Sequence, residues 1–246
     1  MSDTFWAPRD RWRGSYAADV ATPLTNPMAA ATLYGVHDLE VVLVRHGQQI
    51  PPEQRTQEQR FDPPLSDVGE RQIEAVGDHL AAEGIDAVYS SNLERAHRTG
   101  LAIAARHDLD VTVIDDLREI ELFNAIPAGE TWSSMNSRPE MKEAGAEFVA
   151  TGRWSAFPHG ESSESFRNRI NSAMSEVLAR HDGGKIVVAC HGGVINTYLA
   201  ELLGIDRDFW FRTAHCSVNR LLVGHGRQAV WNLNETHHLP GDLSTA

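Results

Sequence analysis

The chain has 246 residues, of which 41% are hydrophobic and 23% are charged, and this composition allows an α/β domain with a sizeable buried core. Its 34 Asp and Glu residues outnumber its 22 Lys and Arg residues, which gives a formal net charge of −12. Such a surface repels phosphate backbones and anionic lipid headgroups, so we expect no nucleic-acid partner and no membrane partner. Two cysteines are too few for a disulfide framework.

Residues 1–37 mix Trp, Pro, Arg and Thr without periodicity. We predict that they form an N-terminal extension ahead of one domain at 38–246. Asp3, Pro8 and Asp10 interrupt the start of the chain, which therefore lacks the apolar core of a signal peptide. The sequence also has no apolar stretch long enough for a transmembrane helix. The expected location is the cytoplasm.

The first predicted element of the domain is a strand at 41–44, a β-branched run typical of a strand buried on both faces. A helix is expected to start at the N-cap residue Ser66 and to end before Gly84. Residues 121–160 are rich in Pro, Gly and Glu, and we expect an irregular segment that caps a site. The other expected elements are strands at 86–90, 111–114, 185–190, 218–223 and 228–231, and helices at 93–106, at 166–178 and from 192 onward.

This alternation of strands and helices predicts an α/β fold. We expect a three-layer sandwich, in which a central, mostly parallel sheet has helices on both faces. Ligands of such sheets bind outside the carboxyl ends of the strands. The residues that follow the two most apolar strands are therefore the first candidates for a functional site.

A histidine directly follows each of these two strands. His46 lies between Arg45 and a glycine, and His191 is followed by Gly192 and a second glycine. Glycines let a ligand approach the backbone closely. The strand at 86–90 leads to Arg95 in the first turn of the next helix. Two histidines and two arginines are therefore expected at one crevice.

This set of side chains suits a phosphoryl group. Planar guanidinium groups bind phosphate oxygens in pairs. An imidazole attacks phosphorus only when it is neutral, and nearby Arg45 and Arg95 would lower the pKa of His46 and keep it neutral. A backbone carbonyl must hold the other ring nitrogen to fix the tautomer.

These motifs, in this order, resemble those of the histidine phosphatase superfamily, which is also called phosphoglycerate mutase-like. The resemblance covers roughly residues 40–240, and it implies an α/β fold and phosphoryl transfer through a phosphohistidine. The matching segments are Arg45-His46-Gly47, Asp62 with Pro64-Leu65-Ser66, Ser90-Ser91 with Arg95-Ala96, Leu117-Arg118-Glu119, Gly160-Glu161-Ser162, Cys190-His191-Gly192-Gly193, and Asn232-Leu233-Asn234 with His238-Leu239.

The resemblance also implies a role for each matching residue. His46 would be the nucleophile that carries the phosphoryl group, and Arg45, Arg95 and His191 would surround the phosphate, with Gly192 beside it. Glu119 would protonate the departing alcohol. Glu121, two residues further on, is the alternative acid.

Two positions depart from the family pattern. Many members have an Asn six residues after the nucleophile, where this chain has Pro52. Gln48 or Gln49 is the candidate for the missing amide. The mutases also carry an Arg-His-Tyr-Gly stretch after their acid, and residues 120–123 replace it with Ile-Glu-Leu-Phe. This difference favours a phosphatase over a mutase.

The predicted function is therefore hydrolysis of a small phosphorylated metabolite without a cofactor or a metal ion. His237 and His238 are adjacent and cannot share one face of a helix as paired zinc ligands do, so we predict no metal site. A P-loop kinase is excluded because the chain lacks the Gly-rich Lys-Ser/Thr loop. A phosphoglycerate mutase and a non-catalytic phospho-ligand binding module remain as alternatives. The sequence leaves the substrate and the oligomeric state open.

Overall fold

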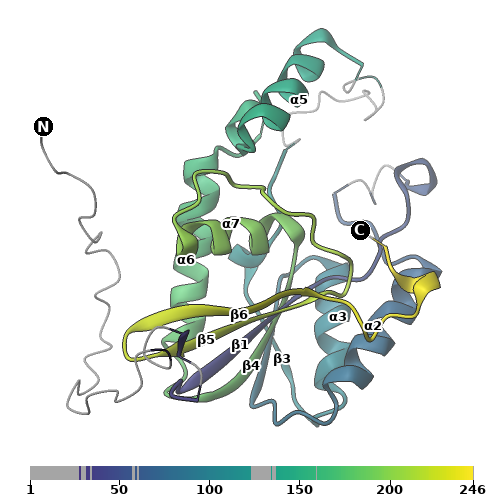
Figure 1. Ribbon diagram of the computed structural model, residues 1–246. Coiled ribbons are helices and arrows are strands. Elements are labelled where there is room, and N and C mark those ends of the chain that lie inside the picture. Colours follow the sequence, from purple (N-terminus) through teal and green to yellow (C-terminus); the bar gives the residue numbers. More distant parts are fainter. Residues whose placement is uncertain are drawn as a thin grey trace, which may run out of the picture.

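The computed structural model describes residues 28, 32–33, 35–56, 59, 61–122, 134, 137–158 and 160–245. The predicted extension at 1–37 lies mostly outside these residues, so it stays a prediction. The described residues form a six-stranded sheet between two layers of helices (Figure 1). None of the helices in this part of the chain is long and apolar enough to cross a membrane.

The sheet is mixed, with the strand order β3-β2-β4-β1-β5-β6. The first four strands in this order run parallel, β5 is antiparallel to β1, and β6 is antiparallel to β5. The prediction of a mostly parallel sheet is confirmed. The strands are β1 (Leu39–Arg45), β2 (Ala87–Ser90), β3 (Val111–Val113), β4 (Gly184–Cys190), β5 (Val218–Gly224) and β6 (Arg227–Glu235).

Four helices make the outer layers. α2 (Asp67–Leu80) and α3 (Glu94–Ala104) cover one face of the sheet, and α6 (Ser163–Leu178) and α7 (Gly192–Leu203) cover the other (Figure 1). The hydroxyl of Ser66 caps α2 by accepting from the amide of Gly69 at 3.1 Å, as the sequence predicts. Short 3₁₀ helices connect these elements at Pro52–Gln54, Asp115–Leu117, Trp154–Ala156 and Gly241–Leu243.

Strands β1 and β4 lie at the centre of the sheet and are buried on both faces. Because successive side chains of a strand point to opposite faces, Leu43 packs among α6 and α7 while Val42 and Val44 pack against α2 and α3. This arrangement fixes β1 between two cores and two neighbouring strands. The residues at its carboxyl end therefore have little freedom to move.

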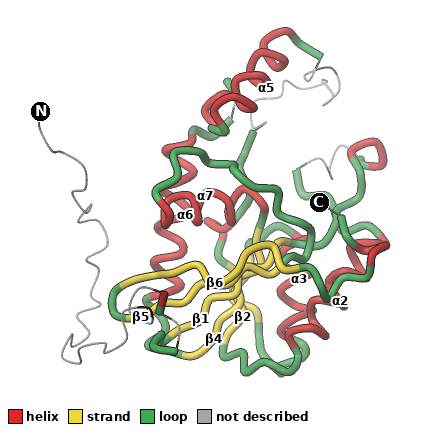
Figure 2. Tube along the Cα trace, in the orientation of Figure 1, coloured by secondary structure: helices red, strands yellow, loops and turns green. Residues whose placement is uncertain are grey.

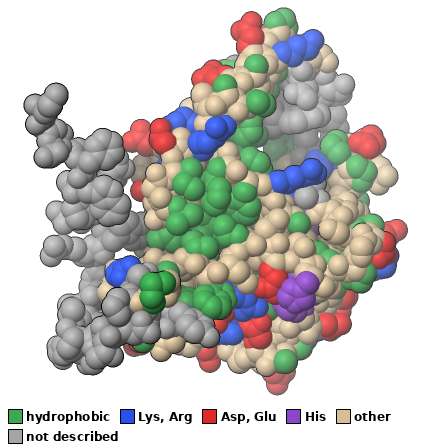
Figure 3. Space-filling model, in the orientation of Figure 1, with side chains coloured by type: hydrophobic (Ala, Val, Ile, Leu, Met, Phe, Trp, Pro, Cys, Tyr) green, Lys and Arg blue, Asp and Glu red, His purple; other side chains and the backbone are tan. Residues whose placement is uncertain are grey.

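The segment at 121–160 differs from the sequence prediction. It is not irregular throughout, because α5 (Pro139–Thr151) lies within it and stands above the sheet, at the top of Figure 2 and of Figure 3. Proline is suited to the first turn of a helix, and Gly152 ends α5 with a left-handed φ of 67°. Pro139 and Gly152 are therefore the boundaries of a helix.

Aromatic contacts hold α5 to the domain. Phe148 stacks on Trp154 with ring centroids 4.7 Å apart, and it also contacts Phe157 and Phe209. After α5 the chain returns to its starting point, since the amide of Glu161 donates to the carbonyl of Glu121 at 2.8 Å. Residues 123–133 lie outside the described part, and whether the whole segment acts as a cap stays a prediction.

Candidate active site

The two predicted histidines lie next to each other at the carboxyl edge of the sheet. β1 and β4 are parallel neighbours, and Arg45 pairs with Cys190 in their register. His46 and His191 directly follow these two residues, so their rings lie with centroids 5.1 Å apart. The amide of His46 donates to the carbonyl of Cys190 at 2.9 Å, which continues the ladder through His46.

The tautomer of His46 follows from its hydrogen bonds. Its Nδ1 lies 2.7 Å from the carbonyl oxygen of Gly47, which can only accept, so Nδ1 carries the proton. Nε2 therefore keeps its lone pair, and the Nε of Arg95 donates to it at 3.3 Å. The expectation that a backbone carbonyl orients this ring is confirmed.

Both histidines are buried and neutral. Burial lowers the pKa of His46 well below its ordinary value, and the positive charge of Arg95 and Arg45 lowers it further. Burial and the same two arginines lower the pKa of His191 in the same way. A neutral imidazole with a free lone pair is the state that a nitrogen nucleophile requires at neutral pH.

The guanidinium of Arg45 is held by residues of the segment that precedes β5. It donates through Nη1 to the carbonyl of Thr213 and through Nη2 to Nε2 of His215, the latter at 3.0 Å. Burial lowers the pKa of Arg45 to about 10, which still leaves the group charged at neutral pH. Gly192 lies beside this guanidinium, because a Cβ at position 192 would stand 3.5 Å from the Nε of Arg45.

Arg95 and His191 complete the ring of donors. Arg95 pairs with Asp62 at 3.4 Å. Nε2 of His191 lies 2.9 Å from the hydroxyl of Ser91, which itself accepts from the amide of Leu93. The Ser91 hydroxyl can donate to Nε2, and in that arrangement the proton of His191 is on Nδ1.

Three buried nitrogens in this region have no hydrogen-bond partner among the described residues. They are Nε of Arg45, Nδ1 of His191 and Nε1 of Trp154. Buried donors without partners are rare, because leaving one unpaired costs about 1–3 kcal/mol. A phosphate group placed next to His46 offers the oxygens that Arg45 and His191 lack.

The two candidate acids, Glu119 and Glu121, differ in the groups that their carboxylates contact. Oε2 of Glu119 accepts from the amide of Gly193 at 3.1 Å, and Oε1 accepts from the amide of Ile120 at 3.0 Å. The carboxylate of Glu119 thus contacts the start of α7 through Gly193, which lies two residues after His191. The carboxylate of Glu121 instead pairs with Arg118 at 2.8 Å. The geometry favours Glu119 as the acid.

Gln48 and Gln49 lie in the loop between β1 and α2. The side-chain oxygen of Gln48 accepts from the hydroxyl of Ser66 at 2.8 Å, so it helps to join the loop after β1 to α2. Gln49 pairs with Leu65 in an isolated antiparallel bridge. Neither glutamine has a side-chain hydrogen bond to the two histidines in the part of the chain that the structure describes. Their role in phosphate binding stays a prediction.

Sequence reasoning missed His215. Its ring centroid lies 5.7 Å from that of His46, and burial together with the charge of Arg45 lowers its pKa to about 3. The signal was its position just before β5. Because β5 is antiparallel to β1, the start of β5 lies at the same edge of the sheet as the end of β1.

Two further arginines lie near these groups. The positive charge of Arg55 adds to burial in lowering the pKa of Arg95, and that of Arg212 does the same for Arg45. Arg55 is half-buried and Arg212 is exposed. Arg55 therefore lies close enough to Arg95 for its charge to act on that group.

Residues 41–236 match the family model of the histidine phosphatase superfamily, branch 1. The chain belongs to this superfamily. It is 31% identical over 209 residues to phosphoserine phosphatase 1 of Hydrogenobacter thermophilus, an alignment that covers 82% of this chain and 94% of that protein. It is also 29% identical to a probable phosphoglycerate mutase of Yersinia enterocolitica, over 74% of this chain and 84% of the relative.

Solved structures agree on the fold. Bacillus stearothermophilus YhfR superposes with a TM-score of 0.71 at 24% identity, over 82% of this chain and all of the other. A mycobacterial glucosyl-3-phosphoglycerate phosphatase superposes with a TM-score of 0.65 at 25% identity, over 80% and 99% of the two chains. The predicted α/β fold and family are confirmed, as is the prediction of a phosphatase for small phosphate esters.

Proposed function

We propose that this histidine phosphatase hydrolyses the phosphate monoester of a small metabolite through a phosphohistidine on Nε2 of His46. One observation carries the proposal. The lone pair of a neutral His46 is oriented by Gly47 and accepts from Arg95, and unpaired nitrogens of Arg45 and His191 lie in the same region. This is the arrangement that in-line attack on a phosphoryl group requires.

In the first step, Nε2 of His46 attacks phosphorus while the bond from phosphorus to the ester oxygen breaks. The electron pair of that bond goes to the departing oxygen, which takes a proton from the carboxyl group of Glu119 and leaves as the alcohol. The charge on the transferred oxygens is held by Arg45, Arg95 and His191. Backbone amides of Gly193 and Ile120 position Glu119 for this transfer.

In the second step, a water molecule attacks the phosphohistidine. Glu119, now a carboxylate, takes a proton from the water as the new P–O bond forms. The N–P bond breaks, its electron pair returns to Nε2 of His46, and inorganic phosphate leaves. The cycle returns both side chains to their starting states.

The arginines supply the positive charge that a metal ion supplies in other phosphatases. We therefore keep the prediction that hydrolysis needs neither a metal ion nor another cofactor. Activity on a small phosphate ester should survive exhaustive treatment with a chelator. A loss of rate that added magnesium or zinc restores would contradict this prediction.

The substrate should carry a second anionic group near the phosphate. Arg55 and Arg212 add positive charge beside the two phosphate-binding arginines and can attract a carboxylate. Relatives named for phosphoserine and for glucosyl-3-phosphoglycerate act on esters with such a group. Phosphoserine should therefore be hydrolysed faster than phosphoethanolamine, which lacks the carboxylate.

The deciding experiment is to trap the intermediate. Rapid quenching without acid, after mixing with a ³²P-labelled ester, should leave label on His46, and His46→Ala should lose both label and turnover. A wild-type protein without label, together with an active His46→Ala variant, would contradict the mechanism. A mutase assay with phosphoglycerate run in parallel tests the main alternative. Cytoplasmic location and the absence of nucleic-acid and membrane partners remain predictions from the sequence.

A further inference from the structure

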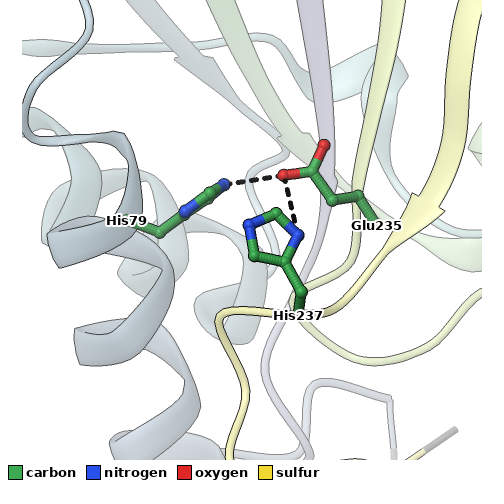
Figure 4. Close-up of side chains that lie close together, drawn as sticks. All are labelled: His79, Glu235 and His237. Carbon is green, nitrogen blue, oxygen red and sulfur yellow. Dashed lines mark hydrogen bonds and ion pairs between the residues drawn. The ribbon is translucent and has the colours of Figure 1, made fainter.

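Three side chains meet where the last turn of α2 lies next to the end of β6. His79 comes from α2, Glu235 is the last residue of β6, and His237 follows two residues later (Figure 4). Nε2 of His79 lies 2.8 Å from Oε1 of Glu235, and Nδ1 of His237 lies 3.5 Å from the same oxygen. The three potential ligand atoms all lie within 4.8 Å of one another.

We propose that His79, Glu235 and His237 bind a divalent transition-metal ion of the zinc type. Two imidazole nitrogens and one carboxylate oxygen form a ligand set that zinc takes, at about 2.0–2.2 Å from each atom, with water at a fourth position. Donors already this close to one another need only small side-chain rotations to reach that distance. Calcium and magnesium prefer oxygen ligands, so two imidazoles select against them.

The surrounding residues present the ligands correctly. The second oxygen of Glu235 accepts from Asn232 at 2.7 Å, which leaves Oε1 for the histidines. The ring of His238 stacks on that of His79 at 4.5 Å, and its own Nε2 lies 3.0 Å from the carbonyl of Cys216. Such outer contacts orient metal ligands and tune their affinity.

The ion can reach this cluster from solvent. The side chain of His237 is 71% exposed, whereas those of Glu235 and His79 are 15% and 18% exposed. Because His237 is exposed while Glu235 and His79 are half-buried, an ion can enter without unfolding the site.

This proposal revises the prediction of no metal site. That prediction rests on the adjacent pair His237 and His238. In the structure His237 instead shares Glu235 with His79, which lies 156 residues before Glu235 in the chain. An ion here would join α2 to the C-terminal segment that runs from β6 to Thr245. The hydroxyl of Thr245 lies 2.9 Å from Nδ1 of His215. The phosphate-binding side chains come from other segments, so the ion has a structural role.

The test is a metal titration of the full chain, purified without a histidine tag and stripped with a chelator. Calorimetry with Zn²⁺ and visible absorption with Co²⁺ should each give one equivalent, with a tetrahedral cobalt spectrum and a raised unfolding temperature. Hydrolysis of p-nitrophenyl phosphate should be the same in the stripped and loaded protein. Failure of metal binding therefore leaves the proposed phosphatase mechanism untouched.

Variants identify the ligands. His237→Ala removes an exposed side chain, so the protein should fold and yet lose more than the roughly 10- to 100-fold in affinity that an outer contact is worth. Asn232→Ala should lose about 10- to 100-fold. His225→Asn is the matched control, since it replaces another exposed histidine at a left-handed φ of 52° that Asn tolerates. No stoichiometric uptake by the wild type, or equal affinity in His237→Ala, would overturn the proposal.

Discussion

The carboxylate of Glu119 accepts a hydrogen bond from the backbone amide of Gly193, which lies 74 residues further along the chain. This contact fixes the candidate acid against the first turn of α7, whose preceding residues include His191. The candidate nucleophile His46, the candidate phosphate-binding residue His191 and the candidate acid Glu119 are thus positioned from three different segments. Each of them can be tested separately.

Glu119→Gln should affect substrates according to their leaving group. An alkyl alcohol leaves poorly without a proton, and proton transfer of this kind contributes about 10²–10⁴-fold to the rate. Nitrophenolate leaves well without one. We expect a large fall in the rate for alkyl phosphates and a much smaller fall for p-nitrophenyl phosphate, measured as single-turnover phosphorylation. Equal losses on both substrates would indicate a binding role.

Gly193→Ala gives an independent check of the same assignment. A Cβ at position 193 would collide with Oε1 of Glu119 and displace it. This variant should therefore show the same dependence on the leaving group as Glu119→Gln. Glu121→Gln is the matched control, because the Glu121 carboxylate pairs with Arg118. A selective loss in that control alone would move the acid to position 121.

Arg95→Ala should slow hydrolysis strongly. Arg95 donates to His46. In the proposed mechanism it faces the phosphoryl oxygens where charge develops, and removal of such a donor typically costs about 10²–10³-fold in kcat. Arg106→Ala is the control. Arg106 pairs with Glu74 and Asp78 at the surface, so its loss should leave kcat close to the wild-type value. Equal small effects would remove Arg95 from the site.

His215 should act through Arg45. It accepts from Nη2 of Arg45, and a hydrogen bond to a charged group is worth about 1.5–3 kcal/mol, so His215→Ala should lower kcat/KM roughly 10- to 100-fold. His215→Gln offers a carbonyl acceptor at a similar reach and should recover part of the loss. If the Gln variant is as poor as the Ala variant, the residue has only a packing role.

The stability of the protein should fall in weak acid. Burial and nearby arginines lower the pKa of His46 and His191 well below the ordinary value, and they lower that of His215 to about 3. The unfolded chain therefore binds these protons from about pH 6.5 downward, while the folded chain does not. The stabilisation from the neutral histidines is complete above that pH and is lost as the pH falls.

Urea unfolding at pH 7 and at pH 5 measures this effect. Each buried histidine should contribute up to about 1.4 kcal/mol per pH unit below 6.5. Carboxylates contribute only at lower pH, as for Glu83, whose pKa the hydrogen bonds of Arg220 and Lys185 lower to about 2 against the opposing effect of burial. His215→Gln should reduce the slope. A stability that does not change between pH 7 and pH 5 would contradict neutral buried histidines.

The site residues that directly follow parallel strands could be predicted from the sequence. His46 and His191 could be found because each ends a run of apolar residues, and the ends of such strands meet at one edge. His215 escaped notice because it precedes a strand, and only knowledge of the antiparallel direction of β5 brings it to that edge. Which strand lies beside which is set by tertiary packing, which short-range patterns do not encode.

Two other features, the helix α5 and the pairing of His79 with Glu235, were not predicted from the sequence for a different reason. α5 was expected to be irregular because Pro139 and Gly152 are also typical of loops, whereas here they start and end a helix. The pairing of His79 with Glu235 depends on how α2 packs against the C-terminal part of the chain. No local pattern in either segment indicates the other.

The hydrogen bond between Glu161 and Glu121 brings together the two ends of the segment that contains α5. A stretch of chain whose ends already touch can change in length or sequence with little effect on the sheet below it. The β1 end that carries His46 has no such freedom. The segment between Glu121 and Glu161 can therefore vary more readily than the strand end that carries His46.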